Sequence, residues 1–217
     1  MNLQVMSALG IEKAFVLGTS QGGWITARMA LLAPDRILGI IPLGTSMDYE
    51  SPRTRELGCW DGITALSPSI EGWSAPSTES EFGFGEDYCN FLISLGFNTH
   101  ISQAEREFWV KATQENYRGE EGRKRARMAG INLRDRDGLL GRVRDVKCPV
   151  LWMHGTEDQV YSVANAKEEI EMFTGAEAKE VVVVEGGAHF LSASHPEEVD
   201  GRVLEFVKKW SAGSKGQ

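Results

Sequence analysis

Residues 15–24, "FVLGTSQGGW", decide the fold, because an apolar run, a turn of small residues and the start of a helix follow one another there. The apolar letters predict a strand. Apolar residues at helical spacing over 21–33 predict a helix that ends before Pro34. Ser20 therefore lies at the turn between a strand and a helix.

The turn also carries a chemical pattern. "GTSQG" at 18–22 matches G-x-S-x-G, in which a serine on a strained strand-to-helix turn projects its hydroxyl from the edge of a sheet. We expect Gly18 and Gly22 to be glycines because a Cβ at either position would crowd the turn. The positive end of the helix dipole would face negative charge that develops beside Ser20.

Three more apolar runs, at 37–44, 149–155 and 179–186, predict further strands. They are rich in Val, Ile and Leu and do not alternate with polar residues, which is typical of strands buried on both faces of a parallel sheet. Helical patterns at 162–174 and 196–210 alternate with these runs. The sequence therefore predicts an α/β fold with a parallel sheet.

A long stretch, 46–147, interrupts this alternation. It begins with a loop-like composition and becomes more helical over about 84–130. Because a loop of this length without secondary structure is rare, we predict a helical cap insertion at 46–145. The predicted core then comprises 1–45 and 146–217.

Two features of this insertion allow two interpretations each. The basic stretch 118–147 is either a solvated helix face or a docking patch for an anionic group, such as a phosphate or a coenzyme A tail. The aromatic residues either form the core of the cap or line a pocket; they are Trp60, Trp73, Phe82, Phe84, Tyr88 and Phe91.

Composition excludes several classes of protein. The 217 residues are 41% hydrophobic and 25% charged, with a net charge of −8, so we expect a globular chain that binds no nucleic acid. The three cysteines are widely spaced and suggest neither disulfides nor a zinc site. Without a recognisable signal peptide or membrane span, we expect a cytoplasmic protein with no membrane association.

Two further polar residues follow predicted strands. Asp158 in "HGTEDQV" lies beyond the third run, and His189 in "GGAHFLSASHP" lies beyond the fourth. Functional residues collect at the carboxyl ends of parallel strands. The order Ser20, Asp158, His189 is the chain order of the α/β-hydrolase triad, and it is more specific than the pentapeptide alone.

Each of these residues also has a simpler interpretation. Ser20 can cap a helix, Asp158 can form a turn or cap the next helix, and His189 can be an ordinary loop histidine. Glu157 and Asp48 are rival acids. We expect the remaining histidines to be structural or uninformative: His154 packs at the end of its strand, His195 precedes Pro196, and His100 lies in the cap.

Three blocks resemble one family: "LGIEKAFVLGTSQGGWITARMALLAPDRILGIIPLG", "CPVLWMHGTEDQVYSVANA" and "EGGAHFLSASHPEEVDGRVLEFV". They resemble the α/β-hydrolase superfamily, and within it the small serine esterases and lactonases with a helical cap. The resemblance implies a nucleophile at Ser20, a base at His189, an acid at Asp158 and an oxyanion donor at the Gln21 N–H. A serine at position 20 would set the chain apart from relatives with Asp there, such as haloalkane dehalogenases and epoxide hydrolases, and from dienelactone hydrolases, which use Cys.

The resemblance also shows a departure, because such relatives carry four more strands before the nucleophile turn. We therefore expect an N-terminally truncated form with about four core strands, arising as a truncated gene model, a fragment or a short isoform. The second oxyanion donor would lie in the absent region. The strand at 14–18 would be a bare edge, through which two copies can pair as a homodimer.

The sequence thus predicts a serine hydrolase that cleaves a small carboxylic ester, lactone or thioester without cofactor or metal. The alternative is a non-catalytic α/β-hydrolase-like fragment that binds a ligand or a partner. A lyase or perhydrolase with the same triad stays open.

Overall fold

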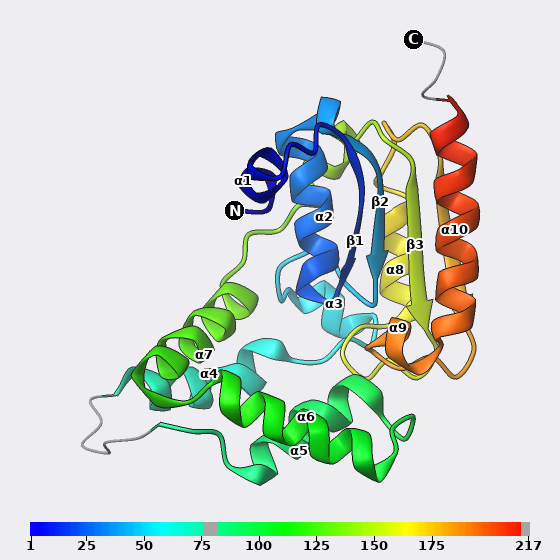
Figure 1. Cartoon of the computed structure of the whole chain (residues 1–217). Coiled ribbons are helices and arrows are strands. Elements are labelled where there is room, and N and C mark those ends of the chain that lie inside the picture. Colours follow the sequence, from blue (N-terminus) through cyan, green and yellow to red (C-terminus); the bar gives the residue numbers. More distant parts are fainter. Residues whose placement is uncertain (76–81, 214–217) are drawn as a thin grey trace.

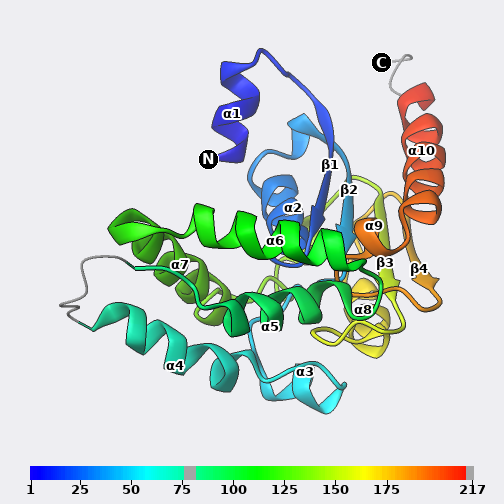
Figure 2. The same cartoon turned by 60° about the horizontal axis from the view of Figure 1, so that its bottom comes forward.

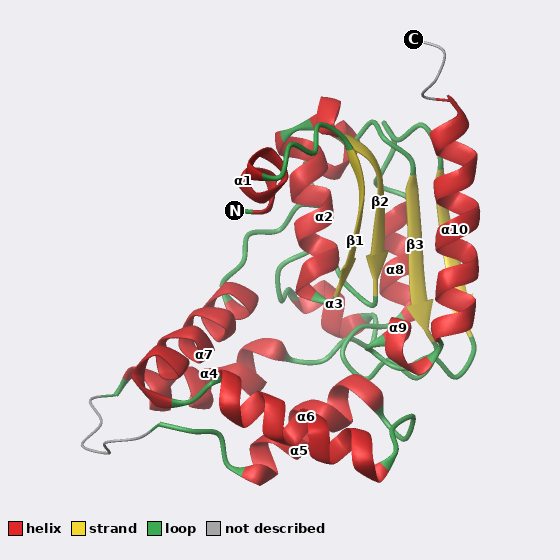
Figure 3. Cartoon of the chain, viewed as in Figure 1, coloured by secondary structure: helices red, strands yellow, loops and turns green. Residues whose placement is uncertain are grey.

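The four apolar runs form the four strands of one parallel sheet in the computed structural model, which describes residues 1–75 and 82–213. In chain order and in spatial order they are β1 (Ala14–Thr19), β2 (Ile37–Leu43), β3 (Val150–Gly155) and β4 (Lys179–Val184). All three neighbouring pairs are parallel. The predicted α/β class with a parallel sheet is confirmed (Figures 1 and 3).

Helices cover both faces of this sheet. One core cluster joins α1 (Asn2–Ala8), α2 (Gln21–Leu32) and α8 (Val163–Ile170) to the sheet face that carries Ile40 and Trp152. The other joins α9 (Leu191–Ser194) and α10 (Pro196–Gly213) to the face that carries Ile41 and Met153. Neighbouring residues on a strand point to opposite faces, so the two central strands, β2 and β3, are apolar on both sides.

Between β2 and β3 the chain forms a separate helical layer beyond the carboxyl ends of the strands (Figures 1 and 2). The short α3 (Pro52–Glu56) leads into this layer. We use "helical layer" for α4 (Gly62–Ser74), α5 (Glu86–Phe97), α6 (Gln103–Asn116) and α7 (Gly119–Arg134). Short 3-10 helices lie at Pro34–Arg36 and Val143–Asp145.

The loop-like interpretation of the first part of the insertion is wrong for α4. This helix contains Pro68 and is capped by Asp61, whose carboxylate accepts a hydrogen bond from the Thr64 N–H at 3.1 Å. It packs closely on α7: a Cβ on Gly130 would lie 2.9 Å from Ile70 Cγ1. Tertiary packing therefore overrides a composition that by itself favours turns. Residues 76–81 of the loop-like stretch lie outside the described residues.

Both ends of the predicted insertion pack against the sheet. Glu169 of α8 accepts hydrogen bonds from Ser46 Oγ and the Met47 N–H, each at 2.6 Å. Burial raises the pKa of Glu169 to about 7, although these hydrogen bonds act in the opposite direction. Met47 and Leu139 are fully buried in the larger core cluster. The loops that enter and leave the helical layer are thus anchored firmly to the core.

Candidate active site

Ser20 occupies a strained turn between β1 and α2. Its φ of 56° and ψ of −125° are unusual for a residue with a side chain, and such strain gathers at functional sites. Its N–H donates to the Leu43 carbonyl of β2 at 2.9 Å, which fixes the turn to the sheet. The side chain makes no capping hydrogen bond to α2, so the helix-cap interpretation has no support in the geometry.

The crowding expected at the turn is present, but the second glycine is a different one. A Cβ on Gly18 would overlap the backbone of Gly22 and Gly23. A Cβ on Gly22 would meet nothing within 4 Å, whereas one on Gly23 would lie 2.6 Å from Thr45 Cγ2. The expectation for Gly22 is therefore wrong, because the close approach of α2 to the loop after β2 occurs one residue later.

Asp158 and His189 are in direct contact. His189 Nδ1 lies 3.0 Å from each carboxylate oxygen of Asp158, and the Asp158 side chain is fully buried. Oδ1 also accepts hydrogen bonds from the N–H groups of Val160, at 2.8 Å, and Tyr161, at 3.0 Å. Burial alone would raise the pKa of Asp158, but its contacts with His154 and His189 outweigh burial and hold that pKa well below its usual range. Asp158 is therefore an ionised carboxylate that fixes the imidazole.

His154 is a second histidine at this carboxylate, and its contact was not predicted from the sequence. Its Nε2 lies 3.3 Å from Asp158 Oδ2 and 2.9 Å from the carbonyl oxygen of Tyr161. Because a carbonyl only accepts, His154 Nε2 must carry the proton. The expected packing at the strand end holds, since the side chain is fully buried. In the sequence, the position of His154 four residues before Asp158 is the feature that could have indicated this contact.

Gly44 makes room for the pair. It follows β2 with a φ of +48°, and a Cβ there would lie 2.8 Å from the His189 carbonyl oxygen and 2.9 Å from Asp158 Oδ2. Any side chain at this position would force the two residues apart. The sequence does not single out Gly44, because glycine is common wherever a strand runs into a turn.

The two rival acids, Glu157 and Asp48, contact other groups. Glu157 is half exposed and contacts Asn98 Nδ2 at 2.9 Å and His100 Nε2 at 3.5 Å. Asp48 is buried and accepts a hydrogen bond from the Tyr49 N–H at 2.9 Å. Among the candidate acids, the one whose carboxylate contacts His189 is Asp158.

Ser20 and His189 line one cavity of about 320 Å³. Most of its other walls are apolar and come from the helical layer, including Leu92, Phe97 and Trp109. Gln21, the predicted oxyanion donor, is the first residue of α2, where backbone N–H groups have no partner within the helix. The structure thus places an ordered Asp–His pair and a strained serine at one mainly apolar space.

The aromatic residues of the insertion divide between the two interpretations. Trp60 lines the cavity, and Phe91 is half exposed. The remaining four pack together in a satellite core of the helical layer: Trp73, Phe82, Phe84 and Tyr88.

Several cations of the basic stretch are paired with nearby carboxylates, which favours a solvated surface over a docking patch. Its ion pairs include Arg123 with Glu120, Lys124 with Glu121, Arg134 with Asp135, and Arg142 with Asp137.

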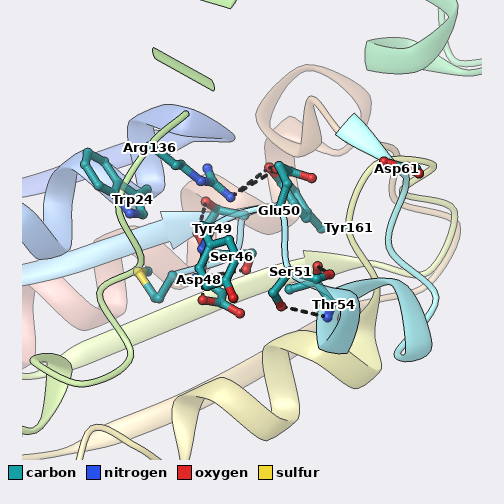
Figure 4. Close-up of polar contacts among 12 residues, drawn as sticks. Trp24, Ser46, Asp48, Tyr49, Glu50, Ser51, Thr54, Asp61, Arg136 and Tyr161 are labelled. Atoms are coloured by element: carbon teal, nitrogen blue, oxygen red, sulfur yellow. Dashed lines mark hydrogen bonds and ion pairs between the residues drawn. The ribbon is translucent and has the colours of Figure 1, made fainter. Parts of the chain in front are cut away.

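A buried ion pair supports the loop that carries Asp158 (Figure 4). Arg136 Nη2 lies 3.5 Å from Glu50 Oε1, and the two side chains are 1% and 2% exposed. The Tyr161 hydroxyl bridges them, accepting from Arg136 at 3.0 Å and donating to Glu50 at 3.1 Å. Burial raises the pKa of Glu50, and Arg136 opposes that rise. Three loops at the carboxyl edge of the sheet are thereby joined.

In residues 1–75 and 82–213, no cluster of three or more His, Cys, Asp or Glu side chains is arranged to hold a metal ion. Within the same described ranges, no helix is both long enough and apolar enough to cross a membrane.

Comparison with known proteins agrees with this architecture. Residues 1–196 match the family model described as the alpha/beta hydrolase fold. Epoxide hydrolase 2 of Siraitia grosvenorii is 23% identical over 237 residues, covering 95% of this chain and 73% of that protein. A hydrolase from Pseudomonas aeruginosa superposes with a TM-score of 0.72 at 19% identity, covering 94% of this chain and 68% of the other. An esterase from Exiguobacterium antarcticum superposes with a TM-score of 0.71 at 17% identity, covering 94% and 70%.

The family match spans most of the chain, and the parallel sheet and its helical insert have the arrangement that the resemblance implied. The chain therefore belongs to the α/β-hydrolase fold family.

Proposed function

We propose that this chain is a serine hydrolase that cleaves a carboxylic ester, lactone or thioester with a mainly apolar acyl group. The observation that carries the proposal is the buried Asp158–His189 pair at the cavity that Ser20 also lines. A serine hydroxyl is a poor nucleophile unless an oriented base removes its proton.

In the proposed mechanism Ser20 Oγ attacks the carbonyl carbon while His189 Nε2 takes its proton. Asp158 keeps the other imidazole proton on Nδ1 and stabilises the imidazolium that forms. The Gln21 N–H donates to the developing oxyanion. His189 then gives the proton taken from Ser20 to the leaving oxygen or sulfur as its bond to the carbonyl carbon breaks, which releases the alcohol or thiol. Water next attacks the acyl-enzyme while His189 takes its proton, and Ser20 Oγ leaves with that proton as the acid is released.

The apolar cavity walls support a neutral acyl group of small to medium size. Epoxide hydrolase 2 of Siraitia grosvenorii is among the relatives of this chain, so epoxide hydrolysis is the competing activity. A serine at position 20 favours ester cleavage, because the resemblance implies an aspartate there in epoxide hydrolases. A small-molecule substrate and a cytoplasmic location complete the proposal, and the division into a core (1–45 and 146–217) and a cap (46–145) is part of it.

A fluorophosphonate probe tests the proposal directly. We expect one covalent adduct per chain by intact mass, located on Ser20 by peptide mapping. Ser20→Ala should lose the adduct and lower kcat for p-nitrophenyl butyrate by at least about 10⁴-fold, because only background catalysis remains without the nucleophile. Ser192→Ala, an exposed serine near His189, is the matched control and should behave as wild type.

Three outcomes would contradict the proposal. Labelling that persists in Ser20→Ala would place the nucleophile elsewhere. Turnover of styrene oxide without ester turnover would favour epoxide chemistry. A folded chain that neither reacts with the probe nor hydrolyses an ester would favour the non-catalytic ligand- or partner-binding alternative.

We further propose that two copies pair through β1, the edge strand at 14–19. Leu17 on this strand is 46% exposed, and unpaired strand edges favour association. Sedimentation equilibrium should show a dimer that Leu17→Lys converts to a monomer. Val183→Lys on β4, the opposite edge, is the control and should leave the dimer intact. A wild-type monomer at micromolar concentration would refute this pairing.

A further inference from the structure

The loop that carries His189 is bonded to helix α5 of the helical layer. Phe190, the residue directly after His189, donates its N–H to the Gly96 carbonyl at 2.7 Å. Gly96 lies in the last turn of α5, where carbonyls have no partner within the helix. The backbone beside the predicted base is therefore held by an element of the helical layer that also lines the cavity.

The ring of Phe190 fits against Gly96 because that residue has no side chain. A Cβ on Gly96 would lie 2.5 Å from Phe190 Cδ2, which is closer than real Cβ atoms approach, and 3.1 Å from its Cγ. Phe97 packs edge-on against the same ring, with centroids 5.2 Å apart. The ring of Phe190 also lies 5.6 Å from the imidazole of His189, at an interplanar angle of 30°.

We propose that α5 positions His189 through Gly96 and Phe190, so that the placement of the helical layer sets whether His189 can serve Ser20. This inference rests on the proposed hydrolase function. Gly96 and Phe190 are then positioning residues. Gly96 and its neighbours on α5 also line the cavity, so an acyl group bound there packs against the helix that holds the base.

Alanine at Gly96 tests this coupling, since the new methyl group must displace the Phe190 ring. We expect Gly96→Ala to lower kcat about 10²-fold, as small misplacements of catalytic groups do, with little change in KM. The loss should be equal for p-nitrophenyl acetate and p-nitrophenyl hexanoate. Gly72→Ala is the matched control, because a Cβ there, also inside a helix, would meet nothing within 4 Å.

A double variant separates positioning from cavity shape. Phe190→Ala alone should also lower kcat on the acetate ester, and adding Gly96→Ala to it should cause no further loss, because the clash is gone. A loss confined to KM, or to the hexanoate ester, would mean that Gly96 merely shapes the cavity and would overturn the proposal. Independent, multiplicative losses in the double variant would also overturn it.

A second readout does not depend on turnover. The Nδ1 proton that His189 shares with Asp158 should give a far-downfield NMR signal, assigned by its loss in His189→Gln. Gly96→Ala should shift or broaden this signal, whereas Gly72→Ala should leave it unchanged. If the wild-type chain hydrolyses neither ester, the proposed function fails, and the coupling is judged by this signal alone. An unchanged signal in folded Gly96→Ala refutes the coupling.

Discussion

Asp158→Asn is expected to lower kcat for ester hydrolysis by about 10⁴-fold while the chain stays folded. The reason lies in the hydrogen bonds that the two oxygens of the Asp158 carboxylate accept. Oδ1 accepts the N–H groups of Val160 and Tyr161, which cannot move independently of the loop. The asparagine oxygen must therefore take this position, and its NH₂ group must take the position of Oδ2.

An NH₂ group at the Oδ2 position faces the wrong partners. It donates toward His189 Nδ1, whereas the asparagine oxygen, also 3.0 Å from Nδ1, already accepts two backbone N–H groups. The variant therefore favours the tautomer with the proton on Nε2, and Nε2 then has no lone pair to accept the proton of Ser20. It also meets His154 Nε2, which carries a proton because it contacts the Tyr161 carbonyl. One atom change thus removes the base function of His189 and sets the new NH₂ group against the N–H of His154.

The measurement is kcat/KM for p-nitrophenyl acetate across a pH series, with Glu157→Gln as the control. Glu157 is the adjacent, half-exposed acid and does not contact His189, so its variant should keep near-wild-type activity. Equal losses in both variants, or more than a tenth of wild-type activity in Asp158→Asn, would contradict the assignment of the acid.

The same variant should change the dependence of stability on pH. A carboxyl whose folded pKa is depressed stabilises the fold above its unfolded pKa, near 3.9, and that contribution is lost as pH falls through the folded value. The difference in free energy of unfolding between wild type and Asp158→Asn should therefore shrink as the pH is lowered below about 4.

The sheet and the Asp158–His189 contact could be predicted from the sequence because both follow from local pattern and topology. Buried parallel strands must be apolar on both faces, as β2 and β3 are. Strands of one parallel sheet end at one edge, so polar residues just after β3 and β4 come together without any knowledge of the loops. The contact between His189 and Asp158 is the outcome.

Contacts between loops lay beyond such reasoning. Nothing local marks Glu50 and Arg136, which are 86 residues apart, as partners, or shows that a charged loop residue is buried. Gly44 and His154 each occupy a strand end, where a glycine or histidine has several ordinary roles. Helix α4 could be predicted only with knowledge of its packing on α7, which compensates for the proline inside α4. Long-range packing decided each of these cases.

Arg136→Met is expected to lower the free energy of unfolding by about 3–5 kcal/mol. Methionine keeps much of the buried apolar volume but leaves Glu50, 2% exposed, without its cation. The side chain that still stabilises the Glu50 carboxylate is Tyr161, whose hydroxyl donates a hydrogen bond to it at 3.1 Å. Removal of one member of a buried pair leaves the other charge buried without a partner. The loss of stability is then far larger than the contribution of the pair itself.

Denaturant unfolding of a set of variants separates these contributions. Arg142→Met breaks an exposed pair with Asp137 and should cost no more than about 1 kcal/mol. The double variant Glu50→Leu with Arg136→Met should recover most of the loss, because Arg136 Nε and Nη1 already lack hydrogen-bond partners in the described structure. A double variant as unstable as Arg136→Met would show that packing, not the stranded carboxylate, causes the loss.

The loss of unfolding free energy in Arg136→Met should depend on pH. The pKa of Glu50 is already raised by burial, and loss of Arg136 should raise it further. A carboxyl with a raised folded pKa binds its proton more tightly in the folded chain than in the unfolded one, so stability falls as pH rises through that interval. The cost of Arg136→Met should therefore be smaller at pH 5 than at pH 8, and a cost that does not change with pH would exclude an ionised Glu50 as its source.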